Sequence, residues 1–338
     1  MQLDDFLRAE IDLGSFPSAS YAVGSSAGIE RLAAHGHAVV VPLRIAATTE
    51  TIYDCASVTK VLITTTLVLQ AVAEGTITLD DRYCGFTYRS LLTHTSGLMA
   101  WLPMYDPSTI DDYRKAVLEQ GPSYEPGTRV VYSDLNFFML WYALTDLFGD
   151  YVEAARTRII APLGLRDSCF NPPPSLLPRI AATEFGQRFE VQKLAKRAAI
   201  EGSRHGLMWG DANDGNSWHH GGTAGNAGLF ATARDAFRIV QAFVRGELVP
   251  LELVREATSN QTPTLDDARG LGWQLATPGN DSTTSLSPRA FGHTGFTGTS
   301  VWVDPDVDRI FVFFTNRVHP CAAPIPMQRL RGEFHRMA

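Results

Sequence analysis

The longest patterned segment of the chain is an apolar stretch over residues 57–74. Its apolar side chains fall on most sides of a helical wheel, which is typical of a helix that is buried nearly all round. Gly75 follows at the position where a glycine commonly ends a helix. A shorter amphipathic pattern over residues 1–14 predicts a surface helix.

Strand patterns lie near both ends of the chain, and helical patterns lie between them. The expected strands are residues 19–23, 38–42, 289–293, 299–303 and 310–316, with a hairpin turn at 304–306. The other expected helices are residues 110–120, 134–148, 150–160, 233–245 and 327–337. This order predicts an α+β fold, with an antiparallel sheet flanked by helices and a mostly helical insertion. We expect residues 1–85 and 245–338 to form the sheet domain and residues 86–244 the helical domain.

The composition argues against several classes of function. The 338 residues carry a net charge of -7 without a long run of either sign, which disfavours nucleic acid as a main partner. No apolar run reaches about 18 residues, so we expect no membrane span. No basic segment followed by an apolar one marks a signal peptide. A cytoplasmic location is therefore expected, or a periplasmic or secreted one if a leader has been removed.

Metal and disulfide chemistry have little support in the sequence. The four cysteines are scattered and form no C-x-x-C pair, so reduced thiols are expected. His219-His220 and His35-x-His37 lack a third ligand at a recognisable spacing, and no H-E-x-x-H motif occurs. We expect neither a metal nor another cofactor.

The predicted buried helix begins with a candidate nucleophile. Ser57 and Lys60 lie three residues apart, so the hydroxyl and the ammonium project from one face of the helix. A serine is a poor nucleophile until another group takes its proton, and a partly desolvated lysine can assist that step. Taken alone, S-x-x-K is weak evidence, because such a tetrapeptide arises about once by chance in a chain of this length. The structural alternative is a helix start whose lysine extends to solvent.

A second motif is Tyr132-Ser133-Asp134, which ends an extended segment and opens a predicted helix. A tyrosine at this point has the reach to act as a proton shuttle for a nearby serine. That role requires neighbouring cations to depress the pKa of its phenol.

A third motif is His293-Thr294-Gly295 on a predicted edge strand, followed by Phe296. Small residues let the backbone N–H groups of such a strand approach a ligand carbonyl closely. The N–H of Phe296, paired with the N–H of Ser57, would form an oxyanion hole.

In this order the three motifs resemble those of the serine β-lactamase and penicillin-binding-protein superfamily, above all the branch of class C β-lactamases, DD-peptidases and family VIII esterases. Further segments that share the resemblance are residues 91–98, 126–127, 162–165, 227–230 and 315–317. The resemblance runs nearly end to end. It implies a β-lactamase/transpeptidase-like fold and a small-molecule acyl substrate.

The resemblance also implies a role for each motif residue. Ser57 is the acylated nucleophile, Lys60 keeps the local field positive, and Tyr132 is the general base for acylation and the acid for the leaving group. His293, with Thr294 and Gly295, lines the cleft where many relatives carry a lysine. The N–H groups of Ser57 and Phe296 would bind the oxyanion.

Two departures from the family pattern bear on the substrate. Asp134 stands where class C β-lactamases usually have asparagine, and an ionised aspartate cannot donate to a substrate carbonyl. It could instead pair with Lys60 and keep that lysine charged. His293 replaces a lysine, so the charge offered to a β-lactam carboxylate becomes conditional on pH. Both changes lower the expectation of efficient β-lactamase activity.

Two other polar features are expected to be structural. His94 is expected to support its loop by hydrogen bonding. The segment Asp214-Gly215-Asn216 is either a loop at the cleft edge that touches substrate or a turn capped by polar side chains, and the turn is favoured.

The sequence therefore supports a metal-free serine hydrolase that acts through an acyl-enzyme on an ester, amide or lactam carbonyl. A carboxylic ester or a D-amino-acid peptide is the favoured substrate, and a β-lactam is a possible slow one. The alternative is a penicillin-binding sensor or scaffold that acylates without turnover or is inactive. The oligomeric state stays open.

Overall fold

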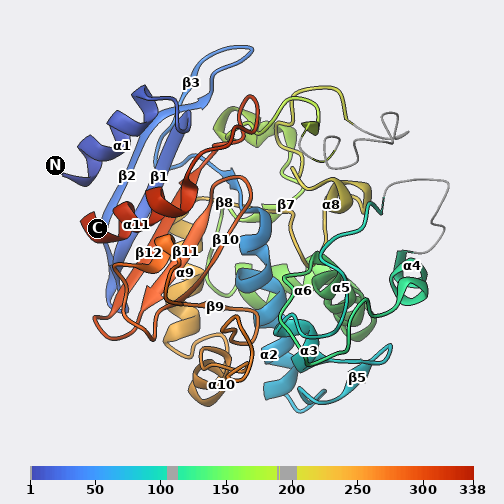
Figure 1. The fold of residues 1–338 in the computed structure, drawn as a ribbon. Coiled ribbons are helices and arrows are strands. Elements are labelled where there is room, and N and C mark those ends of the chain that lie inside the picture. Colours follow the sequence, from blue (N-terminus) through green and yellow to red (C-terminus); the bar gives the residue numbers. More distant parts are fainter. Residues whose placement is uncertain (1, 105–112, 189, 191–203) are drawn as a thin grey trace.

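A computed structural model describes residues 2–104, 113–188, 190 and 204–338. A seven-stranded antiparallel sheet forms one side of the molecule and contains strands from both ends of the chain (Figure 1). Its strands, in spatial order, are β3 (Ile45–Ala46), β2 (Gly28–Val39), β1 (Ser18–Ser25), β12 (Arg309–Thr315), β11 (Ser300–Asp304), β10 (Phe291–Thr294) and β9 (Gln274–Leu275). The pairing of β1 with β12 places the two ends of the chain side by side.

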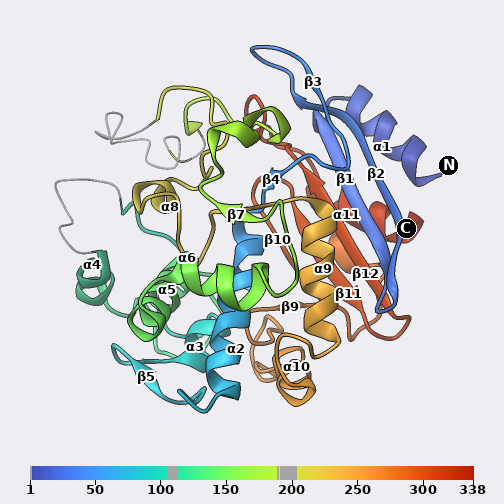
Figure 2. The ribbon, with the colours of Figure 1, turned by 180° about the vertical axis from the view of Figure 1, so that it is seen from behind.

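Both faces of this sheet are covered by helices. On one face, Tyr21 of β1 and Phe313 of β12 pack with α1 (Leu3–Asp12) and α11 (Met327–Met337). On the other face, alternate residues such as Ala22 and Val312 join a larger core that includes α9 (Ala233–Val244). Figure 2 shows α9 crossing this second face. The period-two alternation in β1 and β12 therefore divides the apolar residues between two cores.

One predicted strand has the wrong bounds. Residues 38–42 were expected to form a separate strand, but the structure shows a long strand β2 that ends at Val39. Gly36, a residue type that is typical of turns, lies inside this strand with a φ of +82°. A Cβ at this position would lie 2.2 Å from the carbonyl oxygen of Pro17. The glycine thus permits a close approach of two strands and does not end one.

Helices form most of the other side of the molecule (Figure 1). They are α3 (Tyr88–Leu92), α4 (Tyr113–Gln120), α5 (Asp134–Phe148), α6 (Tyr151–Ala155) with η3 (Arg156–Ile160), and α8 (Gly215–His219). Shorter elements elsewhere are α10 (Leu251–Ala257), the 3-10 turns η4 (Pro174–Arg179) and η5 (Asp281–Thr283), and the hairpin β5 (Arg82–Tyr83) and β6 (Phe86–Thr87). The predicted helix over 110–120 is confirmed from Tyr113 onward, and its first three residues lie outside the described residues.

Helix α9 packs against the sheet, although the predicted boundary at residue 245 assigns this helix to the helical domain. The helix packs there because its apolar face, which includes Phe237 and Val240, is buried against the strands. The division of the chain into two domains stays a prediction.

The predicted buried helix over residues 57–74 runs between the sheet and the helical side. It starts as a 3-10 turn η1 (Ala56–Val58), continues as a π-helical segment η2 (Lys60–Thr65) and ends as α2 (Thr66–Ala73). Gly75 adopts a φ of +70° just beyond its end, as the sequence predicted. Ala56–Ala73 is long and apolar enough to cross a membrane by length and composition, but 78% of it is buried inside the protein, which is typical of a core helix.

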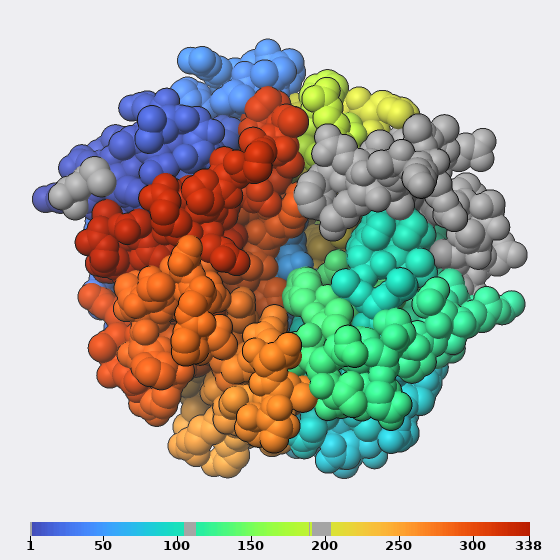
Figure 3. Space-filling view, viewed as in Figure 1, coloured from blue at the N-terminus to red at the C-terminus, as the bar shows by residue number. Residues whose placement is uncertain are grey.

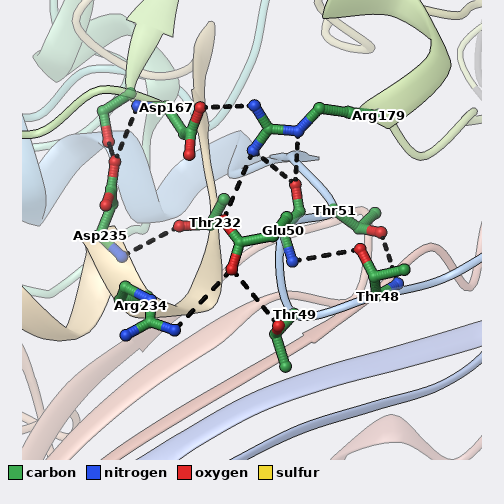
Figure 4. A network of polar contacts seen from close by, with 10 residues as sticks. Thr48, Thr49, Glu50, Thr51, Asp167, Arg179, Thr232, Arg234 and Asp235 are labelled. Atoms are coloured by element: carbon green, nitrogen blue, oxygen red, sulfur yellow. Dashed lines mark hydrogen bonds and ion pairs between the residues drawn. The ribbon is translucent and has the colours of Figure 1, made fainter.

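A small second sheet carries the chain into this helix. Its strands are β4 (Tyr53–Asp54), β8 (Leu229–Ala231) and β7 (Cys169–Phe170). Figure 4 shows polar contacts that join the segments flanking these strands: Arg179 binds Asp167 at 2.8 Å and the carbonyl of Glu50 at 2.9 Å, while Asp235 accepts the N–H of Asp167 at 3.2 Å. These contacts join the segments next to the three strands of the small sheet, and the first of those strands leads along the chain to Ser57.

Candidate active site

A cleft of about 650 Å³ opens beside the start of the buried helix. Ser57, Tyr132 and the strand segment from His293 to Phe296 line it together. Figure 3 shows a hollow between the orange and red C-terminal segments and the green helical side, with blue atoms of the early chain at its floor. Three segments that are distant in the sequence therefore meet at one cavity, as predicted.

Lys60 is fully buried and makes three hydrogen bonds through its ammonium. Its Nζ donates to Ser57 Oγ at 2.9 Å, to Asp134 Oδ1 at 2.7 Å and to the carbonyl of Asn226 at 3.0 Å. The side chain has no exposed surface, so the alternative of a lysine that extends to solvent is wrong. Three donors with three acceptors fix the ammonium one helical turn from the serine hydroxyl.

Asp134 opens α5 and forms an ion pair with Lys60. Burial alone would lower the pKa of Lys60, but the charges of Asp134 and Tyr132 raise it above its ordinary value. Lys60 is therefore an ammonium at neutral pH. The predicted pairing of the two residues is confirmed, and it explains why a carboxylate replaces the amide expected in this family.

Tyr132 is half-buried and surrounded by rings and cations. Lys60 Nζ lies 5.1 Å from its ring centroid, and the rings of His94 and His293 lie 4.8 Å and 5.8 Å away. Burial raises the pKa of Tyr132 above its ordinary value and outweighs the charge of Lys60, which lowers it. The condition stated for the shuttle role, a pKa depressed by nearby cations, is therefore not met in the resting site, and the resting group is a phenol.

His293 is buried and uncharged. Its Nδ1 lies 2.9 Å from the carbonyl oxygen of Thr294, which can only accept, so Nδ1 carries the proton and Nε2 carries the lone pair. Burial, followed by the charge of Lys60, lowers the pKa of His293 well below its ordinary value. The sequence predicted a charge that depends on pH, but the structure places a neutral imidazole at this position.

The strand after His293 lies directly against the nucleophile turn. A Cβ on Gly295 would lie 2.6 Å from the carbonyl oxygen of Cys55, so only a glycine permits this approach. The hydroxyl of Thr299 donates to the same carbonyl at 2.9 Å. Phe296 lines the cleft beside Ser57, and the role of their two N–H groups as an oxyanion hole stays a prediction.

The two features expected to be structural are confirmed as such. His94 Nδ1 accepts the N–H of Ser133 at 3.1 Å, which anchors the Tyr132 motif. Asp214 accepts the N–H of Ser217 at 2.7 Å and caps α8. Among the described residues, no cluster of three or more histidine, cysteine, aspartate or glutamate side chains could hold a metal ion.

Sequence reasoning missed three groups at the site. Asn226 contributes a backbone carbonyl to Lys60, and a carbonyl has no signature in a sequence. Arg269 and Arg331 line the cleft from a loop and from α11. Arg331 had one available signal, because it lies between apolar residues on the buried face of an amphipathic helix.

Comparison with known proteins agrees with this geometry. The Beta-lactamase family profile matches residues 3–333. The chain belongs to the Beta-lactamase family. A curated protein of Salmonella typhi named "Putative D-alanyl-D-alanine carboxypeptidase" is 30% identical over 379 residues, covering 96% of this chain and 84% of the relative. Membership of the Beta-lactamase family confirms the predicted enzyme class, which is a serine hydrolase.

Solved structures of this family show the same fold. A beta-lactamase from Mycobacterium bovis is 22% identical with a TM-score of 0.63, and the match covers 96% of both chains. A penicillin-binding protein homologue from Pyrococcus abyssi, described as octameric, is 19% identical with a TM-score of 0.72, covering 97% of this chain and 76% of the other. EstCE1, described as a hydrolase with promiscuous acyltransferase activity, is 16% identical with a TM-score of 0.73, covering 99% and 97%. These matches confirm the predicted α+β fold class.

The resting protonation state predicts how reactivity depends on pH. Tyr132 and Lys60 both retain their protons, so attack by Ser57 requires the pair to lose one. We expect the rate of fluorophosphonate labelling to rise with pH, with a slope of about one in log rate, between about pH 7 and about pH 10. Tyr132→Phe should lower the rate by about 10²–10⁴-fold and flatten the rise. Intact-mass measurements at each pH provide the rates, and a flat wild-type profile would contradict the shuttle.

Proposed function

We propose that this protein is a D-peptidase-type hydrolase that cleaves an amide or ester next to a free carboxylate, through an acyl-enzyme on Ser57. The observation that carries the proposal is the guanidinium of Arg331, which lines the same cleft. Its Nη2 donates to the carbonyls of Gly295 and Thr299 at 3.2 Å and 3.1 Å. Its Nε is buried without a hydrogen-bond partner, and no carboxylate of the described residues pairs with it.

A buried cation without a counter-charge is costly, so an anionic ligand would be stabilising there. Burial, followed by the charge of Arg317, lowers the pKa of Arg331 to about 9, which leaves it charged at neutral pH. Among the described residues that line the cleft, four are arginines and one carries a carboxylate, namely Arg269, Arg317, Arg329 and Arg331 against Asp281. Arg269 is already paired with Asp267 at 2.7 Å, and Arg329 lies 3.9 Å from Glu10. The buried charge of Arg331 remains, and it favours a substrate that carries a carboxylate.

The geometry supports a two-step reaction. After the Lys60–Tyr132 pair loses a proton, Ser57 Oγ bonds to the carbonyl carbon and its proton passes to the Tyr132 oxygen. Collapse of the adduct breaks the bond to the leaving nitrogen or oxygen, which takes that proton. Water then adds to the Ser57 ester by the same route and releases the acid. The Lys60 ammonium, fixed by Asp134, stabilises the negative charge on the phenolic oxygen whenever that oxygen is without its proton.

The Salmonella relatives support this choice of substrate, because a D-alanyl-D-alanine peptide ends in a carboxylate. A second candidate is an esterase for substrates without a carboxylate. The neutral imidazole of His293 favours it, because it removes the cation that many relatives place at this point.

Matched substrates separate these two candidates. We expect faster turnover of a peptide that ends in D-alanine than of its C-terminal amide, because only the acid can pair with Arg331. Arg331→Gln should reduce the ratio of the two kcat/KM values by about 10–100-fold, the worth of a hydrogen bond to a charged group. A general loss of structure would lower both values without changing their ratio.

The control is Arg336→Gln on the same helix, because Arg336 pairs with Glu333 at the surface. This variant should keep the wild-type ratio. Equal turnover of acid and amide by the wild type would favour the esterase, and a persistent mass adduct without turnover would favour a penicillin-binding sensor.

A further inference from the structure

A buried carboxylate lies behind the nucleophile, at the end of strand β4. The Asp54 side chain is 2% exposed. Its Oδ1 accepts the N–H of Ala56 at 2.7 Å, and its Oδ2 accepts the N–H of Asn213 at 2.6 Å. The two oxygens therefore join the turn that precedes Ser57 to the loop that precedes α8.

The turn that Asp54 binds is strained. Ala56 has a φ of +46°, in the left-handed region, which costs an alanine roughly 1–2 kcal/mol. The hydroxyls of Thr297 and Thr299 donate to the carbonyls of the two residues before Ala56, at 2.8 Å and 2.9 Å. The turn is thus fixed from the β10–β11 side and from the Asp54 side. Ser57 is the next residue, so the turn sets the direction of its hydroxyl and of its N–H.

The surroundings of Asp54 shift its pKa toward neutral pH, so its carboxylate can be protonated in mild acid. The pKa of Asp54 is raised to about 6, chiefly by burial, and the two N–H donors oppose this rise. The charge of Asp214 contributes to the rise, and that of Arg204 opposes it. Arg204 donates to the carbonyls of residues 212 and 213, so it fixes the same loop from the other side. The adjacent Cys55 thiol is neutral, because burial raises its pKa well above the ordinary value.

We propose that Asp54 is a positioning residue, whose ionised carboxylate keeps the Ala56 turn in the geometry that directs Ser57 and whose protonation releases that turn. The inference rests on the proposed role of Ser57 as the nucleophile. A protonated carboxyl presents an O–H to one of two N–H groups that need an acceptor, so one of the two hydrogen bonds is lost.

Acid should therefore lower the reactivity of Ser57 in a step near pH 6, in addition to the decline due to Tyr132. This step is not unfolding. Because the folded-state pKa of Asp54 is raised, the folded protein binds more protons than the unfolded chain between pH 3.8 and about 6. Acid consequently stabilises the fold through this group while it weakens the site.

The test uses the rate of fluorophosphonate labelling of Ser57, which needs no knowledge of the substrate. Asp54→Asn mimics the protonated side chain, so we expect its rate to lie about 10²-fold below wild type above about pH 7, without the step. Asp235→Asn is the matched control. Asp235 is also a buried carboxylate, accepts from Ser168 and Asp167, and does not bind the nucleophile turn, so this variant should retain the step.

A second variant tests the role of Asp54 if the Asp54→Asn protein does not fold. Asp214→Asn can still cap α8 and removes the charge that raises the pKa of Asp54, so the step should move to lower pH. A step retained in Asp54→Asn, or unmoved in Asp214→Asn, overturns the inference while leaving the hydrolase intact. Wild-type protein that no fluorophosphonate labels at Ser57 would overturn the proposed function, and this inference with it.

Discussion

Replacing Ser57 by alanine is expected to abolish turnover, with a loss of roughly 10⁴-fold or more in kcat. The reason is that the cleft offers one hydroxyl whose oxygen lies 2.9 Å from the Lys60 ammonium. Without it no acyl-enzyme forms, and only binding and electrostatic stabilisation of water attack remain. Steady-state rates with a chromogenic ester measure the loss, and intact-mass analysis after fluorophosphonate treatment measures the adduct.

The matched control is Ser259→Ala, because Ser259 is exposed, donates its hydroxyl to the backbone carbonyl of Glu256 and does not line the cleft that contains Ser57. That variant should show wild-type turnover and a single adduct. The Ser57→Ala protein should show no adduct and an unchanged melting temperature to within a few degrees, since the hydroxyl is small and partly exposed. An adduct of full stoichiometry in Ser57→Ala would place the nucleophile elsewhere.

The elements of the fold that could be predicted are those with local signals. Helix α5 has its predicted bounds because Asp134 opens it and Gly149 follows Phe148 with a φ of +80°. The strand β2 could not be bounded in this way. Its glycine at position 36 is of a residue type typical of turns, and only the close approach of Pro17, the residue before strand β1, shows otherwise.

The residues of the candidate site also differ in whether a local sequence signal could identify them. Ser57, Lys60 and Tyr132 could be found because each lies in a short motif, and the structure brings them together. The Asn226 carbonyl could not, because its relation to Lys60 exists only after folding. Arg331 could be identified as a buried arginine of a helix, but its contact with Gly295 exists only after folding.

Protonation states were the least predictable property of the site. The sequence shows that a cation lies near Tyr132 and that a histidine replaces a lysine, but it does not show how deeply either ring is buried. Burial is the largest influence on the pKa of both Tyr132 and His293, and it keeps both groups neutral. A motif thus identifies which groups react, while the packing around them sets which proton moves first.

Replacing Lys60 by methionine is expected to damage both activity and stability, because the two depend on the same ion pair. Methionine fills a similar volume but provides none of the three N–H donors, so Ser57 and Asp134 both lose the ammonium from which they accept hydrogen bonds. We expect kcat to fall by about 10²–10⁴-fold. The free energy of unfolding should fall by roughly 3 kcal/mol, at the low end for a broken buried pair, since the Asp134 side chain is 18% exposed.

The double variant Lys60→Met/Asp134→Asn separates the two effects. Removing the negative charge of Asp134 as well should recover most of the stability, measured by urea unfolding, and none of the activity, because the ammonium is still missing. The pH dependence gives an independent check. The raised pKa of Lys60 means that the pair contributes fully below the ordinary lysine value of 10.5 and is lost as the pH rises through the folded-state pKa. Wild type should therefore lose its advantage over Lys60→Met in strong alkali, and an advantage that persists there would show that the ion pair is not its source.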